Sequence, residues 1–251
     1  MGKKKVVCII QARTGSTRLP EKVLTMIKDQ PMIVHVLNRL RKSKKIDQII
    51  LATTNLPEDE RLTDLASSQK IDSFAGSEHD VLDRFYQAAK RYQAEIVVRC
   101  TGDCPVIDYQ VTDMIIDKHL KSSNDYTSNT VTRTYPRGLD TEVINFEVLE
   151  QSAGAAKKPY EREHVTPYLY QHPEFYSIGQ VEAEGIRRQP DLRLTVDTQD
   201  DLNFISKIFD FLYEQNPYFL IDDILKLLDQ EPKLKKMNSH VKQKPLRIGG
   251  N

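Results

Sequence analysis

The 251-residue sequence has no tryptophan and only three cysteines, Cys8, Cys100 and Cys104. Their odd number and their spacings match neither a zinc site nor a disulfide framework, so we expect a reducing, cytoplasmic environment. No apolar run approaches the roughly 20 residues that span a bilayer. The apolar run at residues 6–10 is also too short for a signal peptide. We therefore expect no membrane partner.

The sequence also lacks an excess of charge of either sign, with 36 Lys and Arg residues against 36 Asp and Glu residues. Binding nucleic acid without reading its sequence requires excess positive charge, so we expect no nucleic-acid partner. The charge is unevenly distributed, because residues 233–251 contain six basic residues and no acidic residue. This segment has no apolar periodicity, and we expect a basic flexible tail over residues 231–251.

Short β-branched runs alternate with segments of helical period, which is typical of a mostly parallel sheet flanked by helices. The sequence therefore predicts an α/β domain over residues 1–230. The expected strands are residues 6–10, 48–54, 71–76, the first part of 95–108, 125–129, 141–146 and 192–197. The expected helices are residues 32–42, 57–70, 79–92, 110–121, 160–171 and 198–215.

The loop after the first expected strand is rich in cations and hydroxyl groups. Its sequence, Q-A-R-T-G-S-T-R-L-P-E-K, contains Arg13, Arg18 and Lys22 but neither of the two common glycine-rich phosphate motifs. Guanidinium groups bind phosphate oxygens bidentately, and open α/β sheets bind ligands at the carboxyl ends of their strands. We interpret the loop as a polyphosphate site. The alternative is a solvated surface loop whose cations pair with neighbouring acids.

Two aspartates, Asp103 and Asp197, each follow an expected strand. Two carboxylates beside a polyphosphate would repel it unless they hold a hard divalent cation, for which Mg²⁺ is the usual choice. The sequence therefore indicates a magnesium site. The alternative is that Asp103 caps a turn and Asp197 caps the following helix.

Six motifs occur in one order along residues 6 to about 228: QARTGSTRLPEK, GSEHDVLDR, RCTGDCPVID, YPRGLDTEV, EREHVTPY and LTVDTQDDL. Together they resemble the cytidylyltransferase family, in particular its spore-coat polysaccharide members. The deoxy-manno-octulosonate and acylneuraminate cytidylyltransferases are related to these. The resemblance implies a fold like that of the nucleotide-diphospho-sugar transferases, with a small dimerisation subdomain and usually a homodimer. It also implies transfer of CMP from CTP to a sugar or sugar acid, with release of pyrophosphate, for surface polysaccharide synthesis.

The resemblance also assigns roles to individual positions. The expected nucleotide-binding residues are Gln11, Ala12, Arg13, Ser16, Arg18, Lys22 and Arg84. The expected catalytic residues are Arg13, Lys22, Asp103 and Asp197, of which the two aspartates bind Mg²⁺. Within about residues 125–185, a region expected to form the sugar pocket and the dimer contact, the expected sugar-binding residues are Glu142, Arg162 and His164. For His164, a packed histidine near a helix start is an equal alternative.

This chain departs from the sugar-acid enzymes at two places. They have a Pro-Ala-Arg type of loop where this chain has Gln11-Ala12-Arg13, and acidic residues often stand where it has Cys104. The acceptor can therefore differ. Two other functions stay open, a glycosyltransferase on a similar fold and a non-catalytic nucleotide-binding subunit. The absence of a D-x-D motif after any expected strand speaks against the first, and the presence of every loop cation and both aspartates speaks against the second.

Overall fold

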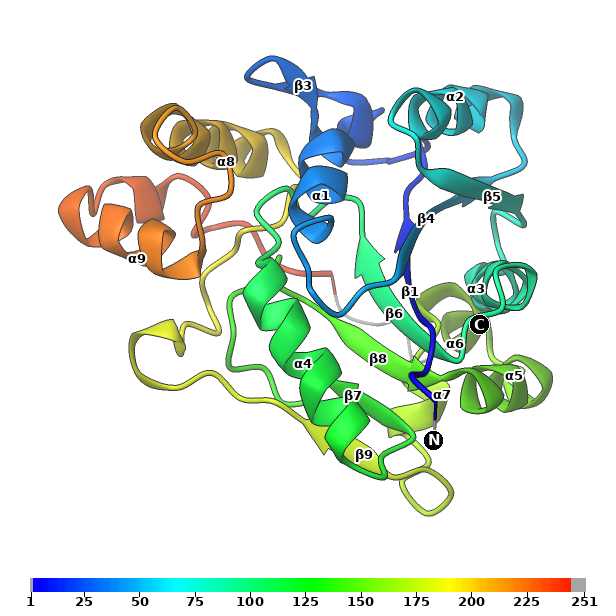
Figure 1. Ribbon diagram of the computed structural model, residues 1–251. Coiled ribbons are helices and arrows are strands. Elements are labelled where there is room, and N and C mark those ends of the chain that lie inside the picture. Colours follow the sequence, from blue (N-terminus) through cyan, green and yellow to red (C-terminus); the bar gives the residue numbers. More distant parts are fainter. Residues whose placement is uncertain (1, 245–251) are drawn as a thin grey trace.

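The structure is a computed structural model that describes residues 2–244. Within these residues, one sheet has seven strands in the order β5-β4-β1-β6-β8-β7-β9, and β2 and β3 form a separate hairpin (Figure 1). The strands are β1 (Val6–Gln11), β2 (Met26–Ile27), β3 (Gln30–Pro31), β4 (Gln48–Thr54), β5 (Asp72–Gly76), β6 (Ile96–Thr101), β7 (Tyr126–Ser128), β8 (Glu142–Asn145) and β9 (Ile178–Gln180).

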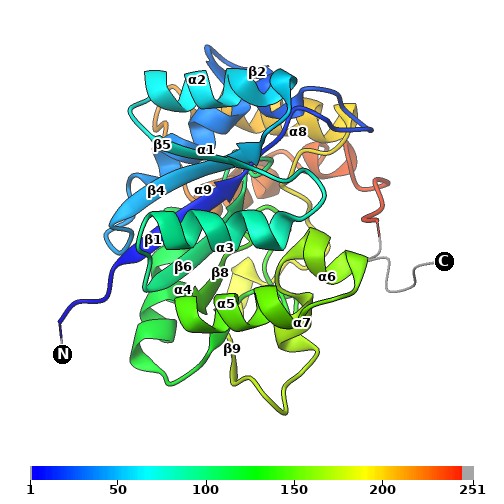
Figure 2. The same ribbon diagram turned by 90° about the vertical axis from the view of Figure 1, so that its right-hand side faces the viewer.

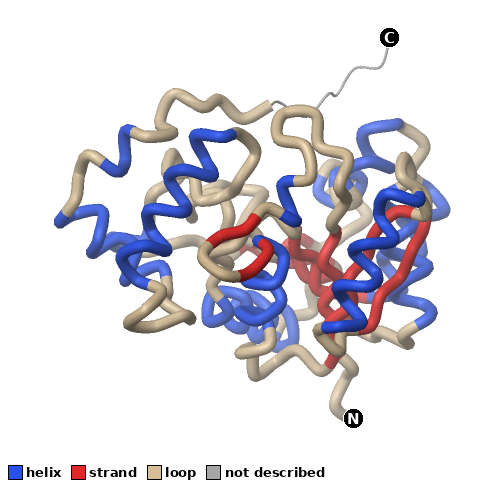
Figure 3. Tube along the Cα trace, turned by 90° about the horizontal axis from the view of Figure 1, so that it is seen from above, coloured by secondary structure: helices blue, strands red, loops and turns tan. Residues whose placement is uncertain are grey.

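Helices cover both faces of this sheet (Figure 3). Those packed on one face are α1 (Met32–Leu40), α2 (Glu60–Ser68), α4 (Tyr109–Lys121), α8 (Gln199–Leu212) and α9 (Ile221–Gln230). Those packed on the other face are α3 (Val81–Arg91), α5 (Phe146–Ala155), α6 (Pro159–His164) and α7 (Pro167–Tyr170). The expected class, a mostly parallel α/β sheet flanked by helices, is confirmed.

The alternation of side chains along β1 divides the core into two layers. Val6, Cys8 and Ile10 pack with the helices of one face, whereas Val7 and Ile9 pack with those of the other. All five are at most 1% exposed. Because burial of a Val or Ile side chain stabilises a protein by about 1.5–3 kcal/mol, this strand is firmly held in the middle of the molecule.

The parallel strands bring three distant segments to one edge of the sheet. β1 pairs in parallel with β4 and with β6, so that their carboxyl ends, at Gln11, Thr54 and Thr101, meet there (Figure 2). β8 then pairs antiparallel with β6 and begins the part of the sheet that β7 and β9 complete. Ligands of open α/β sheets bind at such carboxyl edges, which is where the cation-rich loop begins.

Two expected elements differ from the observed ones. Residues 192–197 do not form a strand, because among the described residues 2–244 their pairing is limited to an isolated bridge between Arg193 and Arg137. Residues 160–171 form two short helices and not one. The chain is interrupted at Val165, whose φ is 72°, and α7 begins at Pro167, which has no N–H to continue α6. Among the elements of residues 2–244, α5, α9, β9 and the β2–β3 hairpin were also not expected from the sequence.

The expected tail begins with residues that contact the domain. A 3₁₀ helix covers Leu234–Lys236, and Asn238 is only 2% exposed. Residues 245–251 of that tail lie outside the described residues, and the domain limits at residues 1–230 stay a prediction. Over residues 2–244, no helix is both long enough and apolar enough to cross a membrane.

Gly138 offers a test of the packing between the loop before β8 and the backbone at Leu194. Its φ is 103°, and an added Cβ would lie 2.5 Å from the carbonyl carbon of Leu194. We expect Gly138→Ala to lower the free energy of unfolding by about 1–3 kcal/mol, measured by urea denaturation. The control is Gly154→Ala in α5, where nothing lies within 4 Å of the added carbon. A helical Gly→Ala change of this kind stabilises by up to about 1 kcal/mol, so equal destabilisation by both variants would contradict the packing described here.

Candidate active site

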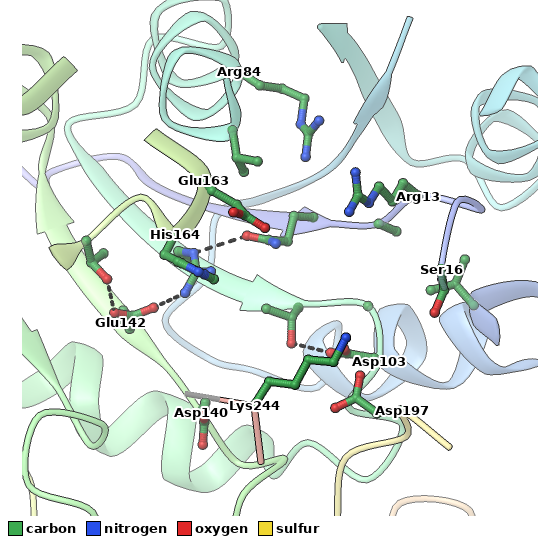
Figure 4. A pocket seen from close by; sticks show the side chains of 18 of the residues that line it. Arg13, Ser16, Arg84, Asp103, Asp140, Glu142, Glu163, His164, Asp197 and Lys244 are labelled. Atoms are coloured by element: carbon green, nitrogen blue, oxygen red, sulfur yellow. Dashed lines mark hydrogen bonds and ion pairs between the residues drawn. The ribbon is translucent and has the colours of Figure 1, made fainter. Parts of the chain in front are cut away.

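A cleft of about 1910 Å³ opens at the carboxyl edge of the sheet (Figure 4). It is lined by polar and charged side chains from the loop after β1, the start of α3, the end of β6, the loops around β8, α6 and the C-terminal residues. All twelve expected site residues line it: Gln11, Ala12, Arg13, Ser16, Arg18, Lys22, Arg84, Asp103, Glu142, Arg162, His164 and Asp197.

The cation-rich loop is fixed by Asp59, a buried carboxylate from the segment before α2. Its Oδ1 accepts hydrogen bonds from the backbone nitrogen of Thr14 at 2.7 Å and from the hydroxyl of Thr14 at 2.6 Å. Thr54, at the end of β4, also donates to Asp59. Burial alone would raise the pKa of Asp59, but these hydrogen bonds lower it, so the carboxylate is charged at neutral pH. The loop is therefore pre-organised.

Lys22 brings the two candidate metal-binding aspartates together. Its Nζ lies 2.8 Å from Oδ2 of Asp103 and 2.7 Å from Oδ1 of Asp197, and it also donates to the carbonyl of Val196 at 2.9 Å. Burial opposes the charge on Lys22, but the two carboxylates raise its pKa. The expected convergence of Asp103 and Asp197 is thus present in the structure. Both are held by one shared ammonium group.

Asp197 has two further cationic partners. Arg18 reaches its Oδ2 from the loop at 2.9 Å, and Arg193 reaches the same oxygen at 2.5 Å. Burial would raise the pKa of Asp197, but Lys22 and the two arginines lower it to about 2. Asp197 is therefore fully ionised at neutral pH and is surrounded by positive charge.

The opposite wall carries two arginines close to one another. Arg13 donates to Glu78 at 3.0 Å, and Figure 4 shows its guanidinium on the side of Arg84. Arg84 is 2% exposed and donates through Nη1 to the carbonyl of Ser77 at 2.7 Å, whereas its Nε has no partner within residues 2–244. Burial and the charge of Arg13 lower the pKa of Arg84 to about 10. A buried donor without a partner is suited to an acceptor atom of a ligand.

The three expected sugar-side residues have different surroundings. Glu142 is 4% exposed and accepts from Tyr126 at 2.6 Å, from Thr166 at 2.7 Å and from Arg99. Arg162 donates from Nε to both carboxylate oxygens of Asp80 at 3.0 Å. Both side chains are therefore engaged within the protein. The His164 ring is half-buried, and burial lowers its pKa, so it is neutral at pH 7.

Sequence reasoning missed several charged residues of the cleft. Arg99 stands inside an apolar strand, which is an unusual place for a charge and could have marked it. Arg133 binds Asp140 through two hydrogen bonds of 2.8 Å, and Asp140 belongs to one of the six quoted motifs. Asp59 gave no such signal, because its partner Thr14 is 45 residues away in sequence. Arg193 gave none either, although its partners Asp197 and Asp201 lie only four and eight residues further along the chain.

Cys104 is a buried thiol beside Asp103 and Thr195. It is 4% exposed, and burial raises the pKa of its thiol well above the usual range. A thiol of this kind is not nucleophilic at neutral pH.

The fold and the cleft define a class of α/β protein with a cleft lined by charged side chains at the carboxyl edge of its sheet. The family model described as "Cytidylyltransferase" matches residues 7–229. The chain therefore belongs to the cytidylyltransferase family and is an enzyme of the nucleotidyltransferase class. The expected resemblance is confirmed, and neither the glycosyltransferase nor the non-catalytic subunit is supported.

Several relatives align over nearly the whole chain. An uncharacterised protein from Methanocaldococcus jannaschii, MJ1063, is 41% identical over 97% of this chain and 98% of its own length. The spore coat polysaccharide biosynthesis protein SpsF of Bacillus subtilis is 33% identical over 90% of this chain and 95% of its own length. The solved structure of a cytidylyltransferase from Leptospira borgpetersenii has a TM-score of 0.88 at 30% identity, covering 96% of this chain and 99% of its own. More distantly, 3-deoxy-manno-octulosonate cytidylyltransferases match less than half of this chain at 32 to 34% identity.

The ionisation of Asp197 predicts a pH dependence of stability. Its pKa is about 2 in the folded chain and about 3.9 when unfolded. A lowered pKa contributes stability that is complete above the unfolded value and is lost as the pH falls through the folded value. Lowering the pH from about 5 to about 2 should reduce the free energy of unfolding of both proteins. We expect this reduction to be about 2 kcal/mol smaller for Asp197→Asn than for the wild type.

The matched control is Asp229→Asn, because Asp229 is exposed at the end of α9. The free energy of unfolding of Asp229→Asn, measured by urea denaturation at each pH, should fall on acidification by as much as that of the wild type. If Asp197→Asn showed the same loss on acidification as the wild type, the ion-pair cluster would not stabilise the fold.

Proposed function

We propose that this enzyme transfers CMP from CTP to a hydroxyl group of a sugar or sugar acid and releases pyrophosphate, for the synthesis of a surface polysaccharide. Membership of the cytidylyltransferase family and the name of the spore coat relative support this proposal. The observation that carries it is the convergence of Asp103 and Asp197 on Lys22, within reach of Arg18.

The loop cations have the right chemistry for the triphosphate. Arg13, Arg18 and Lys22 each contact a carboxylate of the protein, at distances of 2.7 to 3.0 Å. Phosphate oxygens make equivalent charge-assisted hydrogen bonds and can replace these partners. Gln11, Ala12 and Ser16 line the cleft beside these cations, and the guanidinium group of Arg84, whose Nε has no partner within residues 2–244, lies on the side of Arg13 (Figure 4). We assign these seven residues to the nucleotide.

Asp103 and Asp197 are assigned to a divalent cation, with Mg²⁺ as the proposed ion. Mg²⁺ is usually bound by one or two carboxylates and completed by substrate phosphates. The pair fits that requirement, because both carboxylates already share one cationic group and no third acidic, His or Cys ligand joins them within residues 2–244. When bound, such an ion neutralises phosphate charge and lowers the pKa of a nearby hydroxyl group.

The side chains of the protein then position the reaction. An acceptor hydroxyl attacks the α-phosphorus in line, the bond to the pyrophosphate oxygen breaks, and the hydroxyl proton is released. Arg13, Arg18 and Lys22 stabilise the negative charge that develops on the departing pyrophosphate. Catalysis of this kind rests on positioning and charge neutralisation and not on a covalent intermediate.

The acceptor is assigned to the side of the cleft formed by Glu142, Arg162 and His164. Glu142 and Arg162 shape this wall, since their charged groups are already bound to Arg99 and Asp80. The neutral ring of His164 makes no hydrogen bond to any residue of 2–244, so it is the member of the three best suited to contact the sugar. We also propose that the enzyme is a cytoplasmic homodimer whose contact involves residues 125–185.

The experiment that tests this function follows pyrophosphate release. Each of four nucleoside triphosphates is combined with Mg²⁺ and with octulosonates, nonulosonates and polyol phosphates in turn. We expect turnover with CTP and one acceptor class, and a CMP-linked product. Release of pyrophosphate with none of the combinations, or transfer from a preformed sugar nucleotide, would refute the proposal.

Replacing the two aspartates should affect turnover more than binding. We expect Asp103→Asn and Asp197→Asn to lower kcat for CTP by about 100-fold or more, because the charge that they help to neutralise grows in the transition state. KM for CTP should change much less. Steady-state assays are the measurement, with the exposed Asp229→Asn as control. Equal losses in kcat and in CTP affinity would contradict the assigned role.

A further inference from the structure

The C-terminal segment of residues 237–244, which we call the strap, lies against the active site. Its anchor is Asn238, a side chain only 2% exposed. The side-chain nitrogen of Asn238 donates to the carbonyl of Arg193 at 3.0 Å and to Oδ1 of Asp201 at 2.9 Å. Asp201 belongs to the first turn of α8, directly after Asp197. The strap is therefore fastened within four residues of a candidate metal-binding carboxylate.

A single guanidinium group joins the strap to that carboxylate. Arg193, whose side chain is 5% exposed, donates to Asp201 at 2.9 Å and to Asp197 at 2.5 Å. Its third nitrogen donates to the side-chain oxygen of Gln243 at 2.6 Å. The path of the strap and the position of Asp197 are thus fixed by the same buried cation.

The end of the strap forms part of the cleft wall. Gln243 and Lys244 line the same cleft as Asp103 and Asp197, and Figure 4 shows the Lys244 side chain extending to the region of these two carboxylates. In contrast to Arg18 and Lys22, Lys244 takes part in none of the ion pairs formed within residues 2–244. Its ammonium group is available to a ligand.

We propose that the strap is part of the nucleotide site and that the Lys244 ammonium group binds the terminal phosphates of the bound triphosphate. This inference rests on the proposed function, because it requires a polyphosphate beside Asp103 and Asp197. An ammonium group held near the phosphates has a smaller ordering cost than one on a free tail. It adds positive charge where the pyrophosphate leaves. Lys244 is therefore a phosphate-binding residue that the strap contributes to the nucleotide site.

The test compares Lys244→Gln with Lys242→Gln by isothermal titration calorimetry of the full chain. Lys242 is the matched control, because it lies in the same strap, is exposed and does not line the cleft. The ligands are CTP with Mg²⁺, CMP, and inorganic tripolyphosphate. We expect Lys244→Gln to weaken binding of CTP and of tripolyphosphate about tenfold, a change of about 1.4 kcal/mol. Its affinity for CMP, which lacks the terminal phosphates, and all affinities of Lys242→Gln should stay within about twofold of the wild type. Lys244→Arg should restore most of the lost affinity.

Equal affinities of Lys244→Gln and Lys242→Gln for CTP and tripolyphosphate would overturn the inference. The inference would also be overturned if Lys244→Gln lost as much affinity for CMP as for CTP, each relative to the wild type. Tighter binding of CTP by Lys244→Gln than by the wild type would overturn it as well. A wild type that binds tripolyphosphate through Lys244, but neither binds CTP nor releases pyrophosphate from it, would refute the proposed function alone. A wild type that binds neither ligand would refute both.

Discussion

The site depends on the contact of one ammonium group with two carboxylates. Lys22 and Asp197 are 12% and 13% exposed and stand 175 residues apart in sequence, and Asp103 completes the cluster. Without a cation between them, two carboxylates in this position would repel one another, and one would take up a proton. Lys22 keeps both ionised. The cluster therefore holds two ionised carboxylates beside cationic side chains before any ligand is bound, which is the charge arrangement that the proposed metal–phosphate substrate requires.

The surrounding structure keeps this cluster in place. Asp59 accepts a hydrogen bond from Thr14 in the loop that carries Lys22, and Arg193 forms an ion pair with Asp197. Gly102 allows β6 to approach the loop closely, since a Cβ there would lie 2.8 Å from Ile33 and 3.0 Å from Ala12. The parallel pairing of β1 with β6 supplies the common edge. Apart from the Arg193–Asp197 pair, which spans four residues, these contacts join segments that are far apart along the chain, so the site forms only in the folded domain.

Several helices and strands, those that depend on neighbouring positions in the sequence, were predicted correctly. β4 is Gln48–Thr54, as expected, because its run of apolar and β-branched residues is buried along its length. The expected helix over residues 198–215 is present as α8, and its cap is Thr198 and not Asp197, which was the alternative role of that aspartate. The cations of the first loop and the two aspartates could also be recognised, since their residue types and their places after apolar runs suggested binding.

Long-range partners determined the rest, and the sequence does not encode them locally. Residues 192–197 have the composition of a strand, yet within residues 2–244 only an isolated bridge to Arg137 pairs with them. The strap lacks apolar periodicity, and so resembled a free tail, because its attachment is polar and rests on Asn238 and Gln243. Asp59 looked like one of several acids in a helix start, since nothing in the sequence shows that Thr14 lies beside it. Whether a polar side chain such as Asn238 or Asp59 is buried depends on the tertiary structure, so it could not be predicted from the neighbouring sequence.

The most direct measurement is a crystal structure of the enzyme with Mn²⁺ and a CTP analogue that cannot be cleaved, with the anomalous signal used to locate the ion. The account predicts an anomalous peak bound by carboxylate oxygens of both Asp103 and Asp197, with the Lys22 ammonium group moved from the carboxylates to the phosphates. A peak bound only by phosphate oxygens, with Lys22 still joining the two aspartates, would contradict it.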